Sequence, residues 1–141
     1  MLVKQVSVFV ENTTGRLADV TRILADADVD LKASTIADAA DFGILRCIVE
    51  DSEAVKKLLN ENGFNASISE VIAVSLENKA GGFHKVLQIL ADEKVGVKYI
   101  YSTIKSADGE AVIMLRADDN AKAVKVLEDK GIKLVTIDDV K

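Results

Sequence analysis

Two spacings of apolar residues alternate along the chain. Apolar and polar residues alternate at 6–10, which predicts a half-buried strand, and apolar residues recur every three or four positions at 17–27, which predicts an amphipathic helix. The elements expected after these are strands at 30–37 and 43–49, a helix that begins at the N-cap Ser52 and ends before Gly63, and a short strand at 65–69. The first half of the chain therefore has the order strand, helix, strand, strand, helix, strand.

This order of elements is repeated in the second half. Residues 6–29 and 72–95 are identical at 10 of 24 aligned positions, where unrelated segments would share about one or two. The elements expected in the second copy are strands at 72–76, 97–104, 110–115 and 133–137 and helices at 83–93 and 120–130. Val6 aligns with Ile72, but Gly63 aligns with Gly131, so the second copy carries two extra residues in its middle hairpin.

Each copy is a βαββαβ unit, an order that folds as a ferredoxin-like sandwich of four antiparallel strands with two helices on one face. The predicted fold class is therefore α+β, with two such sandwiches in tandem at residues 1–69 and 70–141 and no flexible linker between them. Apolar residues also occupy the sheet face that the helices leave open: Ile44, Ile48, Val112 and Met114. They predict a homodimer or a larger oligomer.

The composition narrows the classes of function. Hydrophobic residues make up 49% of the 141 residues, and the net charge is −5, with basic residues interleaved among acidic ones. A nucleic-acid or anionic membrane surface needs clustered Lys and Arg, so neither partner is expected. The first residues do not resemble a signal peptide, and no apolar run reaches the roughly 18 residues that span a bilayer, which predicts a cytoplasmic protein.

The chain has few of the residue types that carry out catalysis or bind metals. Cys47 lies in an apolar run and is interpreted as a buried thiol, and together with the one histidine, His84, it cannot complete a zinc site. No Ser-His-acid or Cys-His constellation fits the predicted elements. We therefore expect no catalytic residue, no metal and no cofactor. A ferredoxin-like phosphatase stays open on the fold alone, since fold does not fix function.

The segment that carries chemistry is the loop from the first strand to the first helix, at 11–17 and again at 77–83. Its glycine permits a positive φ and leaves backbone N–H groups at a helix start, where the helix dipole also favours an anion. A free amino acid offers a carboxylate to those groups and an ammonium to the side-chain oxygens of Asn12 or Asn78. The alternative is a plain tight turn with a cap, because strand, glycine and helix alone are a weak signal.

The loop sequences ENTTGRL and ENKAGGF, with the domain length and element order, resemble those of ACT domains. That family's loop has an acidic residue or Asn, then Pro-Gly, then a bulky apolar residue, whereas this chain has Thr14-Gly15 and Ala80-Gly81. Residues 40–46 are similar to a segment of small tandem ACT proteins of bacteria and archaea. The resemblance implies amino-acid binding between paired domains, with contacts from the loop of one domain and the second strand of its neighbour.

Transferred residue by residue, the resemblance implies a set of ligand contacts. In the first copy these are Asn12, Thr13, Thr14, Gly15, Arg16 and Leu17 of the loop and Ser34, Thr35 and Ile36 of the second strand. In the second copy they are Asn78, Lys79, Ala80, Gly81, Gly82, Phe83, Tyr99 and Tyr101. Two other side chains can each be interpreted in two ways. Arg46 is either a ligand contact or part of a structural ion pair. His84 is either a ligand contact or an exposed helix residue. Tyr99 and Tyr101 line either a pocket or an interface.

Three functions compete at this point. The leading one is an amino-acid-binding regulatory module, a sensor that passes ligand occupancy to a regulated enzyme or other protein. The second is a protein-protein interaction module of the same fold without a small-molecule ligand. The third is an enzyme. It is disfavoured because the chain offers no Ser-His-acid or Cys-His constellation.

Overall fold

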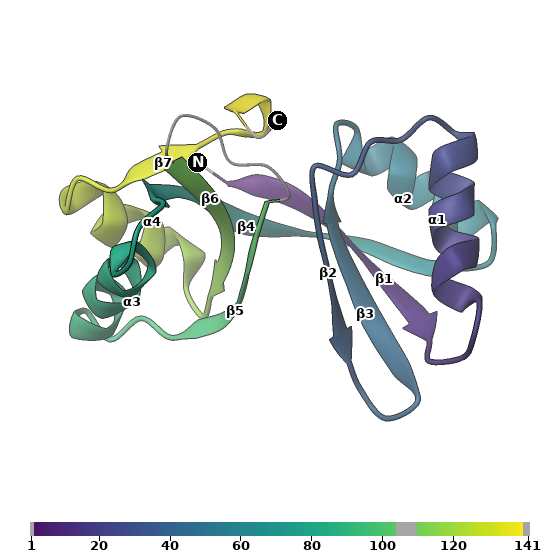
Figure 1. The fold of residues 1–141 in the computed structure, drawn as a ribbon, viewed down its shortest axis with the longest axis horizontal. Coiled ribbons are helices and arrows are strands. Elements are labelled where there is room, and N and C mark those ends of the chain that lie inside the picture. The colour runs from purple at the N-terminus through teal and green to yellow at the C-terminus, as the bar shows by residue number, and fades with distance from the viewer. Residues whose placement is uncertain (1, 104–109, 140–141) are drawn as a thin grey trace. The chain divides into compact units, whose positions relative to one another are not determined.

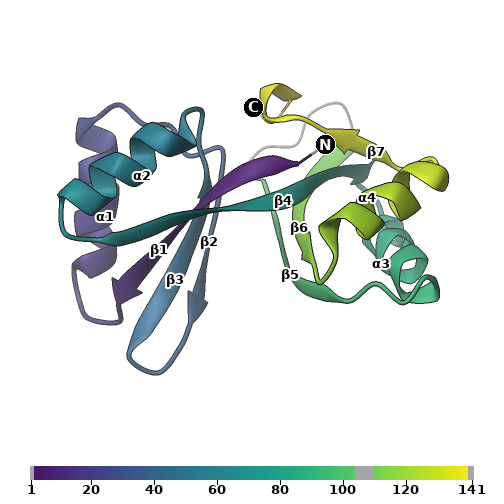
Figure 2. The same ribbon diagram turned by 180° about the vertical axis from the view of Figure 1, so that it is seen from behind.

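The computed structural model describes residues 2–103 and 110–139. The chain divides into two compact units: the first unit is Lys4–Ser69, and the second unit begins at Glu70 and also includes residues 2–3. Figures 1 and 2 show the two units from opposite sides, each with its helices on one face of its strands.

The first unit follows the predicted order. Its elements are β1 (Val3–Glu11), α1 (Arg16–Asp26), β2 (Ala33–Asp38), β3 (Phe42–Ile48), α2 (Ser52–Glu61) and the start of β4 (Asn65–Glu77). The strands lie in the order β2-β3-β1-β4, and β3 runs antiparallel to both β1 and β2.

The second unit repeats this arrangement. Its elements are the rest of β4, α3 (Gly82–Asp92), β5 (Val97–Ser102), β6 (Glu110–Ala117), α4 (Asn120–Asp129) and β7 (Lys133–Val135), followed by the 3₁₀ helix η1 (Ile137–Asp139). The strand β4 lies between β7 and β6, and β5 forms the edge beyond β6, with all these pairs antiparallel. The predicted α+β fold of two ferredoxin-like units is confirmed.

Three details of the prediction were wrong. The strands expected at 65–69 and 72–76 form the single strand β4, because residues 70 and 71 also keep an extended backbone. The strand expected at 133–137 ends at Val135, where Thr136 N donates to Asp139 Oδ2 and η1 begins. The N-cap of α2 is Asp51, whose carboxylate accepts a hydrogen bond from Ala54 N at 3.1 Å, rather than Ser52. Ile104 and the longer hairpin of the second copy lie outside the described residues.

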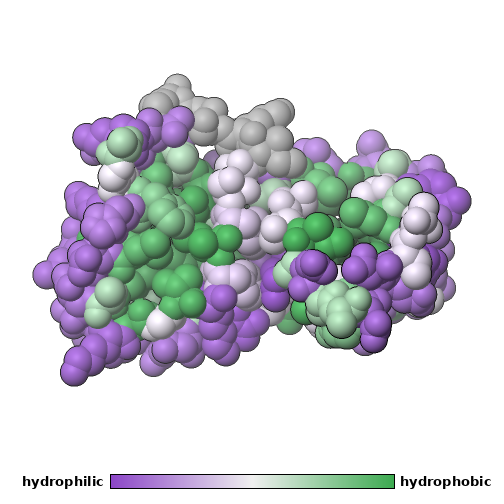
Figure 3. All heavy atoms as spheres, turned by 60° about the horizontal axis from the view of Figure 1, so that its bottom comes forward, coloured by the Kyte–Doolittle hydropathy of each residue, from purple (hydrophilic) through white to green (hydrophobic). Residues whose placement is uncertain are grey.

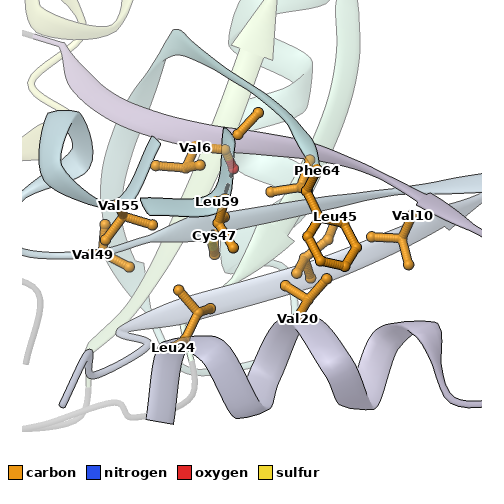
Figure 4. Close-up of a cluster of buried hydrophobic side chains, with 12 residues drawn as sticks. Val6, Val10, Val20, Leu24, Leu45, Cys47, Val49, Val55, Leu59 and Phe64 are labelled. Carbon is orange, nitrogen blue, oxygen red and sulfur yellow. Dashed lines mark hydrogen bonds between the residues drawn. The ribbon is translucent and has the colours of Figure 1, made fainter. Parts of the chain in front are cut away.

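The core of the first unit lies between its two helices and its sheet. Figure 4 shows side chains from β1, β3, α1 and α2 converging there. Cys47 is fully buried in this core, and its Sγ lies 3.8 Å from the Val6 carbonyl oxygen. Burial raises the pKa of the Cys47 thiol from 9.0 to about 11, because the thiolate would lose its hydration. The expected buried thiol is thus confirmed.

The second unit has an equivalent core, built from the same element types. Its buried members are Ile72, Val74, Val86, Leu90, Val95, Ile113, Leu115, Ala117, Ala123 and Leu127. On the opposite face of the strands, Ile48 and Met114 are fully buried within the chain, whereas Ile44 and Val112 are half-buried. The oligomer expected from these four residues stays a prediction.

The first helix of each unit ends on a residue with a left-handed backbone. Asp28 after α1 has φ 56°, and Lys94 after α3 has φ 59°. The backbone N–H of Asp28 donates to Ala25 O at 3.0 Å, and that of Lys94 donates to Ala91 O at 3.0 Å. Both helices thus end in the same way without the glycine that usually occupies this position.

Candidate functional site

The loops before α1 and α3 have the same backbone. Gly15 and Gly81, the N-caps of these helices, have φ 90°, and neither helix start is capped by a side chain. In the part of the chain that the structure describes, no atom outside the immediate chain neighbours lies within 4 Å of a Cβ built at either glycine. Glycine is therefore needed for the backbone conformation and not to avoid a collision.

A pocket of about 260 Å³ adjoins the loop of the first unit. It brings together four of the predicted residues, Asn12, Thr13, Leu17 and Ile36. The other lining residues are Val10, Glu11, Asp38 and Gly43. The strand-helix loop and the second strand of the same unit thus meet at one pocket.

Arg16, the first residue of α1, lies on another side of this loop. Its guanidinium carbon is 4.4 Å from the centroid of the Phe64 ring, a cation–π contact. Its Nη1 is 3.3 Å from a carboxylate oxygen of Asp19, one turn further along the helix. The Arg16 side chain is therefore held by its own unit.

A larger pocket, of about 450 Å³, adjoins the loop of the second unit. It includes four predicted residues, Lys79, Ala80, Gly81 and Gly82. The remaining lining residues come from β4, α3, the start of β6 and the segment that enters β7: Ser75, Leu76, Glu77, Lys85, Val86, Glu110, Gly131, Ile132 and Lys133. This pocket lies beside the fourth strand of its unit, whereas the first unit's pocket lies beside the second strand.

Charges of both signs line the second unit's pocket. Lys79 Nζ is 2.6 Å from Glu77 Oε2, and Lys133 Nζ is 3.7 Å from Glu110 Oε2. The same Glu110 oxygen accepts a hydrogen bond from the Ser75 hydroxyl at 2.8 Å. The hydrogen bond and charge of Lys79 lower the pKa of the exposed Glu77 carboxyl, and the charge of Lys85 adds a weaker effect in the same direction.

Several predicted contacts lie outside both pockets. In the first unit these are Thr14, Gly15, Arg16, Ser34 and Thr35, and in the second unit they are Asn78, Phe83, Tyr99 and Tyr101. Tyr99 and Tyr101 are half-buried on β5, while Phe83 is exposed on the first turn of α3. The pockets therefore gather parts of the loops but only Ile36 from the predicted second strands.

Sequence reasoning missed most of the polar lining of the larger pocket. Ser75 pairs with Lys133 and Glu77 pairs with Glu110 in the sheet, although the partners in each pair lie far apart along the chain. The signal for them is strand register, which a single sequence does not specify. Lys85 had a visible signal, because it replaces the Asp19 of the first copy.

Neither His84 nor Arg46 lines one of the two pockets described above. His84 is exposed on α3, and Arg46 is half-buried on β3 opposite Thr35 and Ser7. Within residues 2–103 and 110–139, no three His, Cys, Asp or Glu side chains group as a metal ion would require. None of the helices in the described part of the chain combines the length and apolar character needed to cross a membrane.

Comparisons with known proteins decide the family. A family model described as an ACT domain pair matches residues 1–141. The chain is a tandem ACT-domain protein. This agrees with the resemblance carried by the two loops, and it confirms the predicted family.

Solved structures place this ACT-domain protein among similar folds. It is 38% identical to protein BT0572 from Bacteroides thetaiotaomicron, with a TM-score of 0.91 and coverage of 99% of this chain and 96% of that one. The ligand-free regulatory subunit of aspartate kinase from Thermus thermophilus shares 13% identity and the fold, with a TM-score of 0.64 over 91% of this chain and 93% of that one. Aspartokinase III from E. coli, in complex with lysine and aspartate, is 18% identical, with a TM-score of 0.54 over 92% of this chain and 31% of that one. No curated protein matches the chain.

Proposed function

We propose that this protein binds a free L-amino acid at its strand-helix loops and passes the occupancy to a regulated enzyme or other protein. The observation that supports this most directly is that the loop residues of each unit border a pocket. The neighbours described as regulatory subunits of aspartate kinase have the same fold, which is consistent with a regulatory module. The two ACT domains of the proposal are residues 1–69 and 70–141.

The chemistry of the loops suits an amino acid. The starts of α1 and α3 are not capped by side chains, so backbone N–H groups near Gly15 and Gly81 can donate to a carboxylate at the positive end of the helix dipole. Carboxylates and side-chain amide oxygens near the pockets can accept from an ammonium group. The proposed site comprises the seventeen residues transferred from the family resemblance, in a homodimer whose neighbouring domain completes it.

A pure interaction module is the second candidate, and one cluster favours it. Phe9 and Phe42 are exposed by 45% and 39%, and their ring centroids lie 5.3 Å apart on the strands of the first unit. In Figure 3, green areas of apolar residues interrupt the purple polar surface on both units. Exposed apolar side chains of this kind are typical of protein-protein contacts.

Thermal unfolding in the presence of each of the twenty amino acids distinguishes the two functions. A ligand that binds only the folded state stabilises it by RT ln(1 + [L]/Kd), about 2.7 kcal/mol at 100 times Kd. For a chain of this length the melting temperature should rise by several degrees. Calorimetric titration of the hits gives the affinity and the number of sites.

Two pairs of variants test the loops. Gly15→Val and Gly81→Val should abolish binding at their own sites, because a β-branched residue resists φ 90° and its side chain stands beside the helix start. Gly15→Asn and Gly81→Asn are the matched controls, since Asn tolerates this backbone conformation far better. Circular dichroism establishes that each variant is folded. We would abandon the sensor for the interaction module if no amino acid at millimolar concentration gives a shift or heat, or if both Val variants bind unchanged.

A further inference from the structure

The two loops share a backbone, but several equivalent positions in them and in the helices that follow differ. Arg16 and Asp19 in the first unit correspond to Gly82 and Lys85 in the second, in the same alignment that pairs Gly15 with Gly81. The aromatic Phe64 likewise corresponds to Ile132, each directly after the glycine that follows the second helix of its unit. The second unit thus has a glycine in place of the arginine, a lysine in place of the aspartate, and a smaller apolar residue in place of the phenylalanine.

In the first unit these residues contact one another. The Arg16 guanidinium covers the Phe64 ring at 4.4 Å and lies 3.3 Å from Asp19. None of Arg16, Asp19 and Phe64 lines the first unit's pocket, which lies on the side of β2. Asp19 also pairs with Arg22 at 3.6 Å, so the space beside this side of α1 is filled by side chains that already contact one another.

In the second unit the corresponding volume is open. Gly82, Lys85 and Ile132 all line the pocket of about 450 Å³. This volume falls in the range of small-molecule sites. Gly82 is also required for a local reason, because a Cβ there would overlap the backbone carbonyl oxygen of Glu77. The missing side chain is thus a fixed property of this loop as folded.

The charge at one of these positions is also reversed. Lys85 replaces the acid Asp19; among residues 2–103 and 110–139 it forms no direct ion pair, although its charge also acts on Glu77. Lys79 and Lys133 are paired with Glu77 and Glu110 respectively. Among the described residues, the lining therefore carries three ammonium groups and two carboxylates, an excess of one positive charge.

We propose that the pocket of the second unit binds an acidic amino acid, and that the first unit has no equivalent pocket on this side of its helix because Arg16 and Asp19 occupy that space; the first unit's separate pocket beside β2 is not affected. This inference rests on the proposed function and names the ligand class and the unit. The ligand's single net negative charge matches the excess positive charge of the lining, and one carboxylate pairs with the Lys85 ammonium. The ligand's own ammonium is held by Glu110 or Glu77, the two acids of the lining.

Calorimetric titration with six ligands tests the ligand class on the wild-type chain. L-Aspartate and L-glutamate carry both carboxylates and the ammonium, L-asparagine and L-glutamine lack the second carboxylate, and succinate and glutarate lack the ammonium. We expect one acidic amino acid to bind once per chain, at least about tenfold more tightly than its amide or its amine-free analogue.

Three variants test the residues. Lys85→Gln should weaken binding about tenfold, and Lys85→Asp should weaken it further, because it restores the charge of the first unit. Lys125→Gln removes an exposed helix lysine that does not line the pocket, and should bind within about twofold of wild type. Circular dichroism and thermal unfolding show whether each variant folds.

The outcomes separate this inference from the proposed function. If a neutral or basic amino acid binds and the acidic ones do not, or if Lys85→Asp binds as wild type does, the acidic site is wrong while amino-acid binding stands. If succinate or glutarate binds as tightly as the acidic amino acid, the ligand class is wrong, and the pocket binds a simple dicarboxylate. Two sites per chain overturn the single acidic site assigned to the second unit. If no amino acid binds at all, both proposals fail together.

Discussion

Raising the pH above 9 should weaken the first unit through its buried thiol. Cys47 is fully buried, and burial raises its pKa from 9.0 to about 11. Well below pH 9 the thiol is protonated in both folded and unfolded chains, so it contributes no pH dependence there. Between pH 9 and 11 the unfolded chain loses this proton and the folded chain retains it, so the free energy of unfolding falls as the pH rises.

The size of the effect follows from the two pKa values. One unit of difference corresponds to about 1.4 kcal/mol, so the loss is about 1 kcal/mol at pH 10 and approaches roughly 3 kcal/mol above pH 11. That is a large share of the net free energy of unfolding of a typical folded domain, which is on the order of 10 kcal/mol. No comparable loss is expected from Cys47 below pH 8.

Urea unfolding of the wild type and of Cys47→Ala, each at pH 8, 9, 10 and 10.5 with a reductant, measures this loss. Lysine and tyrosine side chains titrate in the same range, but they are common to both chains and cancel in the difference. Cys47→Ala should be less stable at pH 8, because it leaves a small cavity. The stability gap should shrink by about 1 kcal/mol by pH 10. If the two pH profiles run parallel, the thiol ionises as easily in the folded chain as in the unfolded one, and the reasoning is wrong.

Two further predictions concern the helix ends. Asp51→Ala and Asp119→Ala should each cost about 1 kcal/mol in urea unfolding, because each carboxylate accepts a backbone N–H at 3.1 Å; a cost near zero for both would contradict this. Asp28→Asn should raise the melting temperature more than Lys94→Asn, although both residues have the same left-handed backbone. Asn suits that backbone in both cases, but the first change removes an unfavourable negative charge from a helix C-terminus and the second removes a favourable positive one. The reverse order in differential scanning calorimetry would refute this.

The sequence predicted what depends on local spacing. The helical period of the apolar residues and the glycine before each helix place α1 and α3 correctly, because an amphipathic helix buries one face of its own sequence. Residues 65–69 and 72–76 were predicted as two strands, because the first ends one copy of the repeat and the second begins the next. The structure keeps these residues in one strand, where the Glu70 carbonyl oxygen accepts a hydrogen bond from Asn120 Nδ2 at 3.0 Å.

The candidate site was predicted less completely than the fold. The loops were found because they recur in sequence, but the charges around the larger pocket come from pairs such as Ser75 with Lys133, which only strand register brings together. The asymmetry between the units depends on Arg16 and its contact with the ring of Phe64, which lies at the far end of the first unit's sequence, directly before β4. The loop sequences alone could not show which side chains fill the space beside the helix start and which leave it open.

The continuous strand β4 has a consequence for how the chain can be divided. Its 13 residues cross the boundary between Ser69 and Glu70, and residues 71–75 within it are buried. Proteases usually separate domains at exposed, flexible segments, since the cut backbone must leave its hydrogen bonds and enter an active site. Limited digestion of the native chain should therefore not release the two ACT domains as separate fragments, as it does for domains joined by a loop.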